Sequence, residues 1–397
     1  MGVVGQWTGR HATALRGALR LTTEAYSEHL GVAPRTVSYW AANPDRVCRP
    51  AMQQVLDTAL ARADHAVRER FHVAVGVPVE IPTETWEFAD LLTRCAITTT
   101  GLNALETAIH ECAGRYPATG PGAVLASNER QMERLGEVLR HPLPVAIRRR
   151  SVRLLGLLAG IVGHQHFDLG DVPRARRLFD LGRLASIEAE DPDLEAWLLA
   201  TASIVAYFDG QNARAVALLT EAAALATRHS TPRRQAWIAA MRGRALAAAG
   251  KAADTHRALA EAQRLLGTVL DQPNGNDFFD LARLDGMTGA AMTKIGDTPR
   301  AAQALGRALH SRASTDGKGR ALLTLDLASC LLTAGEYEEA ARLVGTALDI
   351  AGVNFVRPIL TRTIQVRSSF RPDQTPRVVA ELDQRIRAAA SQFQMAT

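Results

Sequence analysis

Apolar residues near the start of the chain recur at intervals of three and four, the spacing of one helix face. They predict three short helices whose inward faces are, in order, Leu15, Ala18 and Leu19; Ala25, Tyr26 and Leu30; and Val37 and Trp40. Thr22 or Thr23 can cap the second helix. Gly31 suits the left-handed position that ends it, and Pro34 suits the first turn of the third helix. A helix, a short turn with glycine and a second, polar helix form a helix-turn-helix.

A second pattern repeats from residue 147 onward. Its turn glycines, 40, 40, 46 and 39 residues apart, are Gly170, Gly210, Gly250, Gly296 and Gly335. A small residue stands seven positions before each glycine, and a larger apolar residue stands nine positions after it. Small residues let two helices approach closely, and the larger residue is expected to fill the groove between neighbouring units. Because one hairpin cannot bury its own face, five stacked hairpins are predicted.

The repeat resembles the tetratricopeptide repeat, with a small residue in the first helix and Ala in the second, although its unit is about 40 residues rather than 34. The predicted fold class is therefore all-α: an N-terminal helix-turn-helix domain, 1–75, followed by a tetratricopeptide-like α-solenoid, 146–350. Two prolines among apolar residues predict a linker at 76–85. An intermediate helical region follows at 86–145, broken at 116–122, and capping helices are expected at 351–397.

Composition narrows the class of protein. Hydrophobic residues make up 47% of the chain but aromatic residues only 5%, which favours helices built from Ala and Leu. The 397 residues include 46 basic and 41 acidic ones, a formal charge of +5. Residues 1–50 contain six Arg and three acidic residues, which gives +3 in that segment. A small basic lobe of this kind is a modest indication of nucleic-acid binding.

Several features point to the cytoplasm. No signal-peptide pattern opens the sequence. The longest apolar stretch, 154–163, is too short to cross a bilayer, so no membrane association is expected. Four cysteines without a C-x-x-C pair argue against a disulfide framework or a zinc site. The pairs His110/Cys112 and His164/His166 are each two residues apart, so they point to different sides of a helix and no metal site is expected.

The string EHLGVAPRTVSYW resembles the Xre, or lambda-repressor-like, family of DNA-binding regulators, with the match over Leu30–Val32 and Thr36–Trp40. The surrounding sequence looks like a group of Xre-type regulators that carry tetratricopeptide-like C-terminal regions. The resemblance implies that helix 34–41 enters the major groove of double-stranded DNA and that a homodimer binds two half-sites, with the protein associated with the nucleoid. The DNA-binding residues it implies are Thr22, Thr23, Pro34, Arg35, Thr36, Ser38, Tyr39, Arg46 and Arg49.

In tetratricopeptide proteins the first helix of each unit lines the concave face. The corresponding positions here are His164, Trp197, Tyr207, Trp237, Arg244 and Arg283. Two Trp beside Arg and His can hold a peptide or an acidic, partly apolar small molecule as effector. The alternative is that both Trp are core residues between units and the Arg are solvated, because aromatic residues at helical spacing belong more often to the core.

Motifs of catalysis are missing from the sequence. There is no phosphate-binding glycine loop, no G-x-S-x-G and no H-E-x-x-H, so the chain is expected to be a binding protein that needs no cofactor rather than an enzyme. The favoured interpretation is a transcriptional regulator. The alternative is a protein–protein adaptor or antitoxin-like assembly protein whose helix-turn-helix lobe docks protein.

Overall fold

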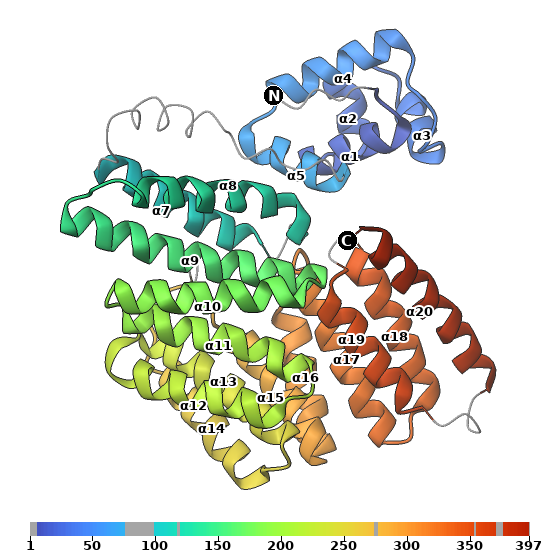
Figure 1. Cartoon of the computed structure of the whole chain (residues 1–397). Helices are drawn as coiled ribbons and strands as arrows, with labels where there is room; N and C mark the ends of the chain where they lie inside the picture. Colours follow the sequence, from blue (N-terminus) through green and yellow to red (C-terminus); the bar gives the residue numbers. More distant parts are fainter. Residues whose placement is uncertain are drawn as a thin grey trace. The chain divides into compact units, whose positions relative to one another are not determined.

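The structure, a computed structural model, describes residues 6–75, 99–116, 120–273, 277–352, 355–370 and 376–396. Apart from turns and loops, these residues form α-helices, and an isolated antiparallel bridge joins Thr8 to Val47. The all-α prediction is therefore confirmed. The chain divides into two compact units, Met1–Phe88 and Ala89–Thr397 (Figure 1). The predicted linker at 76–85 lies outside the described residues.

The N-terminal unit is a bundle of short helices around aromatic residues. Its helices are α1 (Gly9–Leu19), α2 (Thr23–Leu30), α3 (Pro34–Ala42), α4 (Pro50–Arg62) and α5 (His65–Val75). Trp7 is fully buried and stacks on Phe71 at 5.3 Å between ring centroids, and its indole N–H donates to Asp57 at 2.6 Å. Large buried rings of this kind supply much of the hydrophobic stabilisation of a small domain.

The turn between α2 and α3 follows the predicted chemistry. The Thr22 hydroxyl accepts a hydrogen bond from the backbone N–H of Ala25 at 3.2 Å and caps α2. Gly31 ends α2 in the left-handed region, with φ +65°. Pro34 occupies the first position of α3, where a missing N–H leaves no bond unmade. Val37 and Trp40 are buried against the rest of the unit, which leaves the opposite face of α3 to solvent.

Gly9 fixes how closely α1 approaches the end of α3. A Cβ at this position would lie 2.3 Å from the carbonyl oxygen of Asn43 and 2.5 Å from that of Trp40. Backbone atoms cannot rotate away, so only glycine fits here.

The second unit is a stack of helical hairpins (Figure 1). Its helices are α7 (Thr99–Arg115), α8 (Pro121–Leu139), α9 (Val145–Leu169), α10 (Val172–Glu188), α11 (Pro192–Phe208), α12 (Asn212–His229), α13 (Pro232–Ala248), α14 (Ala252–Leu266), α15 (Leu281–Ile295), α16 (Thr298–Ser311), α17 (Gly317–Thr333), α18 (Tyr337–Ala351), α19 (Arg357–Ser368) and α20 (Pro376–Ala396). The five predicted hairpins are α9/α10 to α17/α18. Helices α7 and α8 pack on α9, and α19 and α20 pack on α17 and α18 at the other end.

The turn glycines and the small residues have the roles that the repeat predicted. All five turn glycines have positive φ, between 74° and 96°. A Cβ at Gly289, seven residues before its turn, would lie 2.5 Å from Leu305, and one at Gly243 would lie 2.9 Å from Leu259. The larger residue thus packs against the small residue of its own hairpin, and Leu259 also shares a core cluster with Ala291 and Met292 of the next hairpin.

The last helices of this unit return to the first hairpin. Helix α19 contacts α9, and the Arg357 guanidinium donates to Asp209 at 2.7 Å and lies 5.2 Å above the Phe167 ring. Phe393 of α20 lies 3.4 Å from where a Cβ of Gly170 would stand. The stack therefore curves until its ends meet, and the first helices of the hairpins surround its inside.

Candidate functional site

The exposed face of α3 is the candidate nucleic-acid interface. Arg35, Ser38 and Tyr39 are exposed, Tyr39 at 45%, whereas Val37 and Trp40 on the opposite face are buried. Thr36 is half-buried, and Pro34 is exposed at the helix start. The Ser38 hydroxyl donates to the Pro34 carbonyl at 3.3 Å, which leaves its lone pairs available to a ligand. The predicted residues of this helix therefore share one accessible surface.

Two further arginines lie in the segment that follows α3. Arg46 and Arg49 are both exposed, and neither they nor Arg35 form an ion pair with another described residue. Arg10, in contrast, is neutralised by Asp45 at 2.8 Å. Three arginines that have no carboxylate partner in the described part of the chain favour a positive surface here, which suits phosphate.

Thr22 and Thr23 are placed differently from one another at the start of α2. Thr22 is exposed and its oxygen caps the helix, while Thr23 is half-buried and its oxygen accepts from Arg16 at 2.8 Å. The start of a helix carries partial positive charge and suits an anion. Arg16 adds a cation at the same end, which the sequence analysis did not include.

A cavity of about 420 Å³ lies inside the curved stack. Its lining includes residues of the first helices α9, α11, α13, α15 and α17 and of α7, which is the side expected from the repeat. Trp197, Trp237, Phe278, Ile161, Ile204 and Leu322 form the apolar part of the wall. The charged residues of the lining are Arg283, Arg312, Asp316 and Lys318.

Four of the six residues predicted for the groove line this cavity: His164, Trp197, Trp237 and Arg283. The two Trp are 6% and 5% exposed, so they are core residues and wall residues at once. Tyr207 and Arg244 do not line the cavity, contrary to expectation. The Arg244 guanidinium instead lies 4.4 Å above the Tyr207 ring, closer to the turn end of the helices.

A buried polar cluster at one end of the cavity was missed by sequence reasoning. Asp168 is 0% exposed, and its Oδ2 accepts hydrogen bonds from the Tyr116 hydroxyl and from Lys318 Nζ. Lys318 Nζ also lies 3.2 Å from His164 Nε2 and 5.5 Å from the Tyr116 ring centroid. These four residues come from the end of α7, from α9 and from α17, so the cluster joins the start of the stack to its last hairpin.

Burial and charge shift the pKa of His164, of Asp168 and of Tyr116. Burial, followed by the nearby Lys318 ammonium, lowers the pKa of His164 to about 4, so its ring is neutral at pH 7. Burial alone would raise the pKa of Asp168, but Lys318 holds it below the usual range. Burial and the Asp168 carboxylate raise the pKa of Tyr116. The cluster therefore contains an ammonium–carboxylate pair beside a neutral imidazole.

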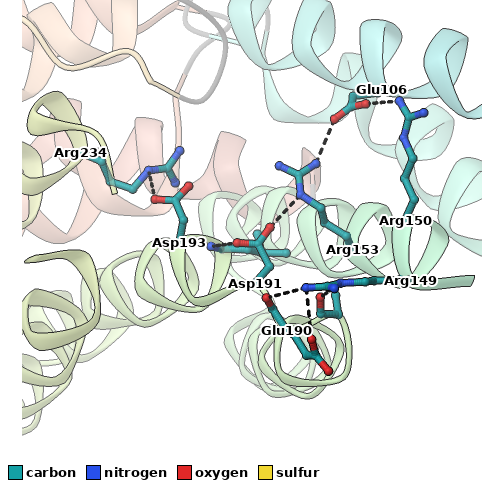
Figure 2. A network of polar contacts seen from close by, with 10 residues as sticks. Glu106, Arg149, Arg150, Arg153, Glu190, Asp191, Asp193 and Arg234 are labelled. Atoms are coloured by element: carbon teal, nitrogen blue, oxygen red, sulfur yellow. Dashed lines mark hydrogen bonds and ion pairs between the residues drawn. The ribbon is translucent and has the colours of Figure 1, made fainter. Parts of the chain in front are cut away.

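A second charged region lies at the start of α9, and Figure 2 shows its contacts. Arg153 bridges Glu106 of α7, at 2.9 Å, and Asp191 before α11, at 2.7 Å, while Arg150 pairs with Glu106 at 2.5 Å. Arg149 donates to the Ala189 carbonyl at 2.7 Å. A hollow of about 500 Å³ adjoins this network, but each of these arginines already has an acceptor. The network fastens α7 to the repeats and is a weaker candidate for a ligand site.

No group of residues suited to a metal ion occurs in the part of the chain that the structure describes. His166 points away from the cavity residue His164, and its Nε2 lies 3.0 Å from Glu129. None of the described helices is long and apolar enough to cross a membrane.

Searches of family models and of curated proteins find no match for this chain. Among solved structures, BtubC (BKLC) from P. vanneervenii matches 59% of this chain and 92% of its own, with 18% identity and a TM-score of 0.42. A Rap protein complexed with Competence and Sporulation Factor matches 98% of this chain and 99% of its own, with 11% identity and a TM-score of 0.44. Similarity at this level assigns neither a ligand nor an activity to this chain.

Proposed function

We propose that this protein is a transcriptional regulator of the lambda-repressor-like type that binds double-stranded DNA through α3. The observation that carries the proposal is the accessible polar face of α3, which presents Arg35, Thr36, Ser38 and Tyr39 on a helix fixed by Val37 and Trp40. A helix of this size fits the major groove, where Arg can make a bidentate contact with guanine. Arg46, Arg49 and the capped start of α2 supply contacts for the adjoining phosphates.

In this proposal the repeat unit regulates DNA binding by holding an effector. Its cavity of about 420 Å³ combines an aromatic wall with a charged end and is in the size range of small-molecule sites. An effector bound there acts as a switch only if it prefers one of two arrangements of the protein. We also propose that the protein works as a homodimer on two half-sites, with binding and not catalysis as its activity.

Binding-site selection from random duplex DNA with the full chain tests the DNA-binding proposal. We expect a selected sequence with two related half-sites about one helical turn, roughly 34–36 Å, apart. Arg35→Ala should reduce the preference for the selected sequence over a scrambled one by about 10- to 100-fold, since a bidentate Arg–guanine contact contributes about 1–3 kcal/mol. Arg228→Ala, an exposed arginine of α12 in the repeat unit, is the matched control and should leave the preference unchanged.

The alternative function makes the opposite prediction. An adaptor would enrich no DNA sequence, and its protein partners would remain bound at high salt and after nuclease treatment, whereas phosphate contacts weaken steeply with salt. That result would contradict the proposal.

A further inference from the structure

The charges on the cavity wall favour an anion. Its lining contains three cations, Arg283, Arg312 and Lys318, against one carboxylate, Asp316, while Asp280 and Asp168, which pair with Arg283 and Lys318, lie outside the lining. Both oxygens of Asp316 are occupied: Oδ1 accepts from the Gly319 N–H at 2.8 Å, and Oδ2 lies 2.8 Å from Arg312 Nε. Asp316 is moreover 7% exposed, so it contributes little negative surface to the cavity.

Several buried polar atoms near the cavity, donors as well as the acceptor Asp168 Oδ1, have no hydrogen-bond partner among the described residues. Lys318 can only donate, so His164 Nε2 accepts from it, and the neutral ring carries its proton on Nδ1. His164 Nδ1 and Arg312 Nη1 are both buried and have no hydrogen-bond partner among the described residues. Both atoms are covered by protein, so the member of the cluster that a ligand can reach is the Lys318 side chain, which is 20% exposed and can donate up to three hydrogen bonds.

The rest of the wall favours a flat, apolar body. Trp197 and Trp237 occupy equivalent places in successive hairpins, and Phe278 meets Trp237 edge-on at 5.7 Å between ring centroids. Ile161, Ile204 and Leu322 complete the apolar lining. Aromatic walls gain most from burying another planar ring, because such pairs add about 0.5–1.5 kcal/mol beyond the area that they bury.

We propose that the cavity binds a small aromatic carboxylic acid. Its carboxylate lies at the partly exposed Lys318 ammonium, and its ring lies against Trp197 and Trp237. This inference rests on the proposed function, because it names the class of effector that the repeat unit would sense. The volume of about 420 Å³ suits one ring system with a short acidic arm better than an extended peptide.

The carboxylate position explains how such an acid would influence the fold. Lys318 of α17, in the last hairpin, pairs with Asp168 of α9, in the first, so an acid bound to Lys318 adds a contact at the closure of the stack. A ligand that binds only the closed arrangement stabilises it by mass action. Binding should therefore raise the melting temperature of the protein.

Isothermal titration calorimetry of the full chain at pH 7.5 compares two probes with the same ring, 1-naphthaleneacetate and 1-naphthaleneacetamide. We expect the acid to bind at least 10-fold more tightly than the neutral amide. Lys318→Met removes the charge but keeps the length of the stem, and it should weaken the acid about 10-fold while leaving the amide unchanged. Lys251→Met, the same substitution at an exposed lysine after the α13 turn, should change neither affinity.

The double variant Lys318→Met/Asp168→Asn controls for misfolding of the single variant. It removes the Asp168 carboxylate together with the Lys318 ammonium, so no unpaired charge is left buried. It should fold, as judged by its melting curve, and should still bind acid and amide with equal affinity. Equal affinity of the wild-type protein for acid and amide, or no heat from either probe, would overturn the inference. Because the titration contains no DNA, a protein that binds the acid but selects no DNA sequence would refute the proposed function and leave this inference intact.

Discussion

Lys318 Nζ donates a hydrogen bond to Asp168 Oδ2, although the two residues lie 150 positions apart in the sequence. Lys318 opens α17 in the last hairpin, and Asp168 lies near the end of α9 in the first. This ion pair therefore closes the stack across its inside. The same lysine stands at the charged end of the cavity, so the residue that holds the repeat unit together is also the one best placed to meet an anionic ligand.

Removing the charge of Asp168 should destabilise the repeat unit strongly. Asp168→Asn leaves the Lys318 ammonium and the Tyr116 hydroxyl around a neutral amide, and breaking a buried pair from one side costs about 3–5 kcal/mol. Denaturant unfolding followed by circular dichroism measures the loss. Glu339→Gln is the control, because the Glu339–Arg342 pair on α18 is exposed and should contribute nothing measurable. A loss for Asp168→Asn no larger than that of the control would show that the closure does not depend on this pair.

Stability should fall as the pH drops from about 6.5 to about 4. The pKa of His164 is lowered to about 4 in the folded protein, whereas the unfolded chain binds a proton near pH 6.5. Between these values the unfolded state binds more protons than the folded one, so acidification favours unfolding. Lys318 opposes protonation of His164, and Asp168 only partly offsets it.

Melting temperatures of the wild type and of His164→Gln, measured at half-unit steps from pH 7.5 to 4.5, isolate this contribution. Gln can still accept from Lys318 but does not titrate, so the variant should lose less stability across this window than the wild type. Parallel curves for the two proteins would show that His164 is not the residue responsible.

Gly160 should tolerate no side chain, whereas Gly306 should benefit from one. A Cβ at Gly160 would lie 2.3 Å from Cζ3 of the buried Trp197 ring, and overfilling a packed core costs about 1–3 kcal/mol. Gly306 on α16 has nothing within 4 Å, so Gly306→Ala should stabilise the helix by roughly 0.5–1 kcal/mol. Thermal unfolding of Gly160→Ala and Gly306→Ala should thus give shifts of opposite sign. A stabilised Gly160→Ala would mean that Trp197 does not pack against α9 as described.

The hairpins could be predicted from the sequence because each depends on contacts that repeat locally. Trp197, Trp237 and Arg283 each lie 13 residues before their turn glycine, and all three line the cavity. Leu322 stands at the same distance before Gly335, so this register could also have identified it. Tyr207 follows Trp197 by ten residues, about 15 Å along the helix, so Tyr207 does not line the cavity.

The polar cluster could not be predicted in the same way. Tyr116, Asp168 and Lys318 meet only because small rotations between successive hairpins add up until the stack closes, and no local pattern encodes that sum. One feature of the sequence could have drawn attention to Lys318: it is one of only three lysines among the 46 basic residues of the chain. The helix-turn-helix was easier to predict from the sequence, because Thr22, Gly31 and Pro34 each determine a hydrogen bond or a backbone dihedral angle within a few residues.

Arg46 and Arg35 should affect DNA binding in different ways. Arg46 is exposed after α3 and is expected to contact phosphate, so Arg46→Ala should weaken selected and scrambled DNA equally. Losing one phosphate contact should also reduce the slope of log affinity against log salt by about 0.9. Arg35→Ala should instead lower the preference for the selected sequence. Fluorescence anisotropy of both variants between 50 and 200 mM salt, roughly the range over which phosphate contacts change affinity most visibly, measures the two effects together. A change of sequence preference in Arg46→Ala with an unchanged slope would place Arg46 at a base edge and not at the backbone.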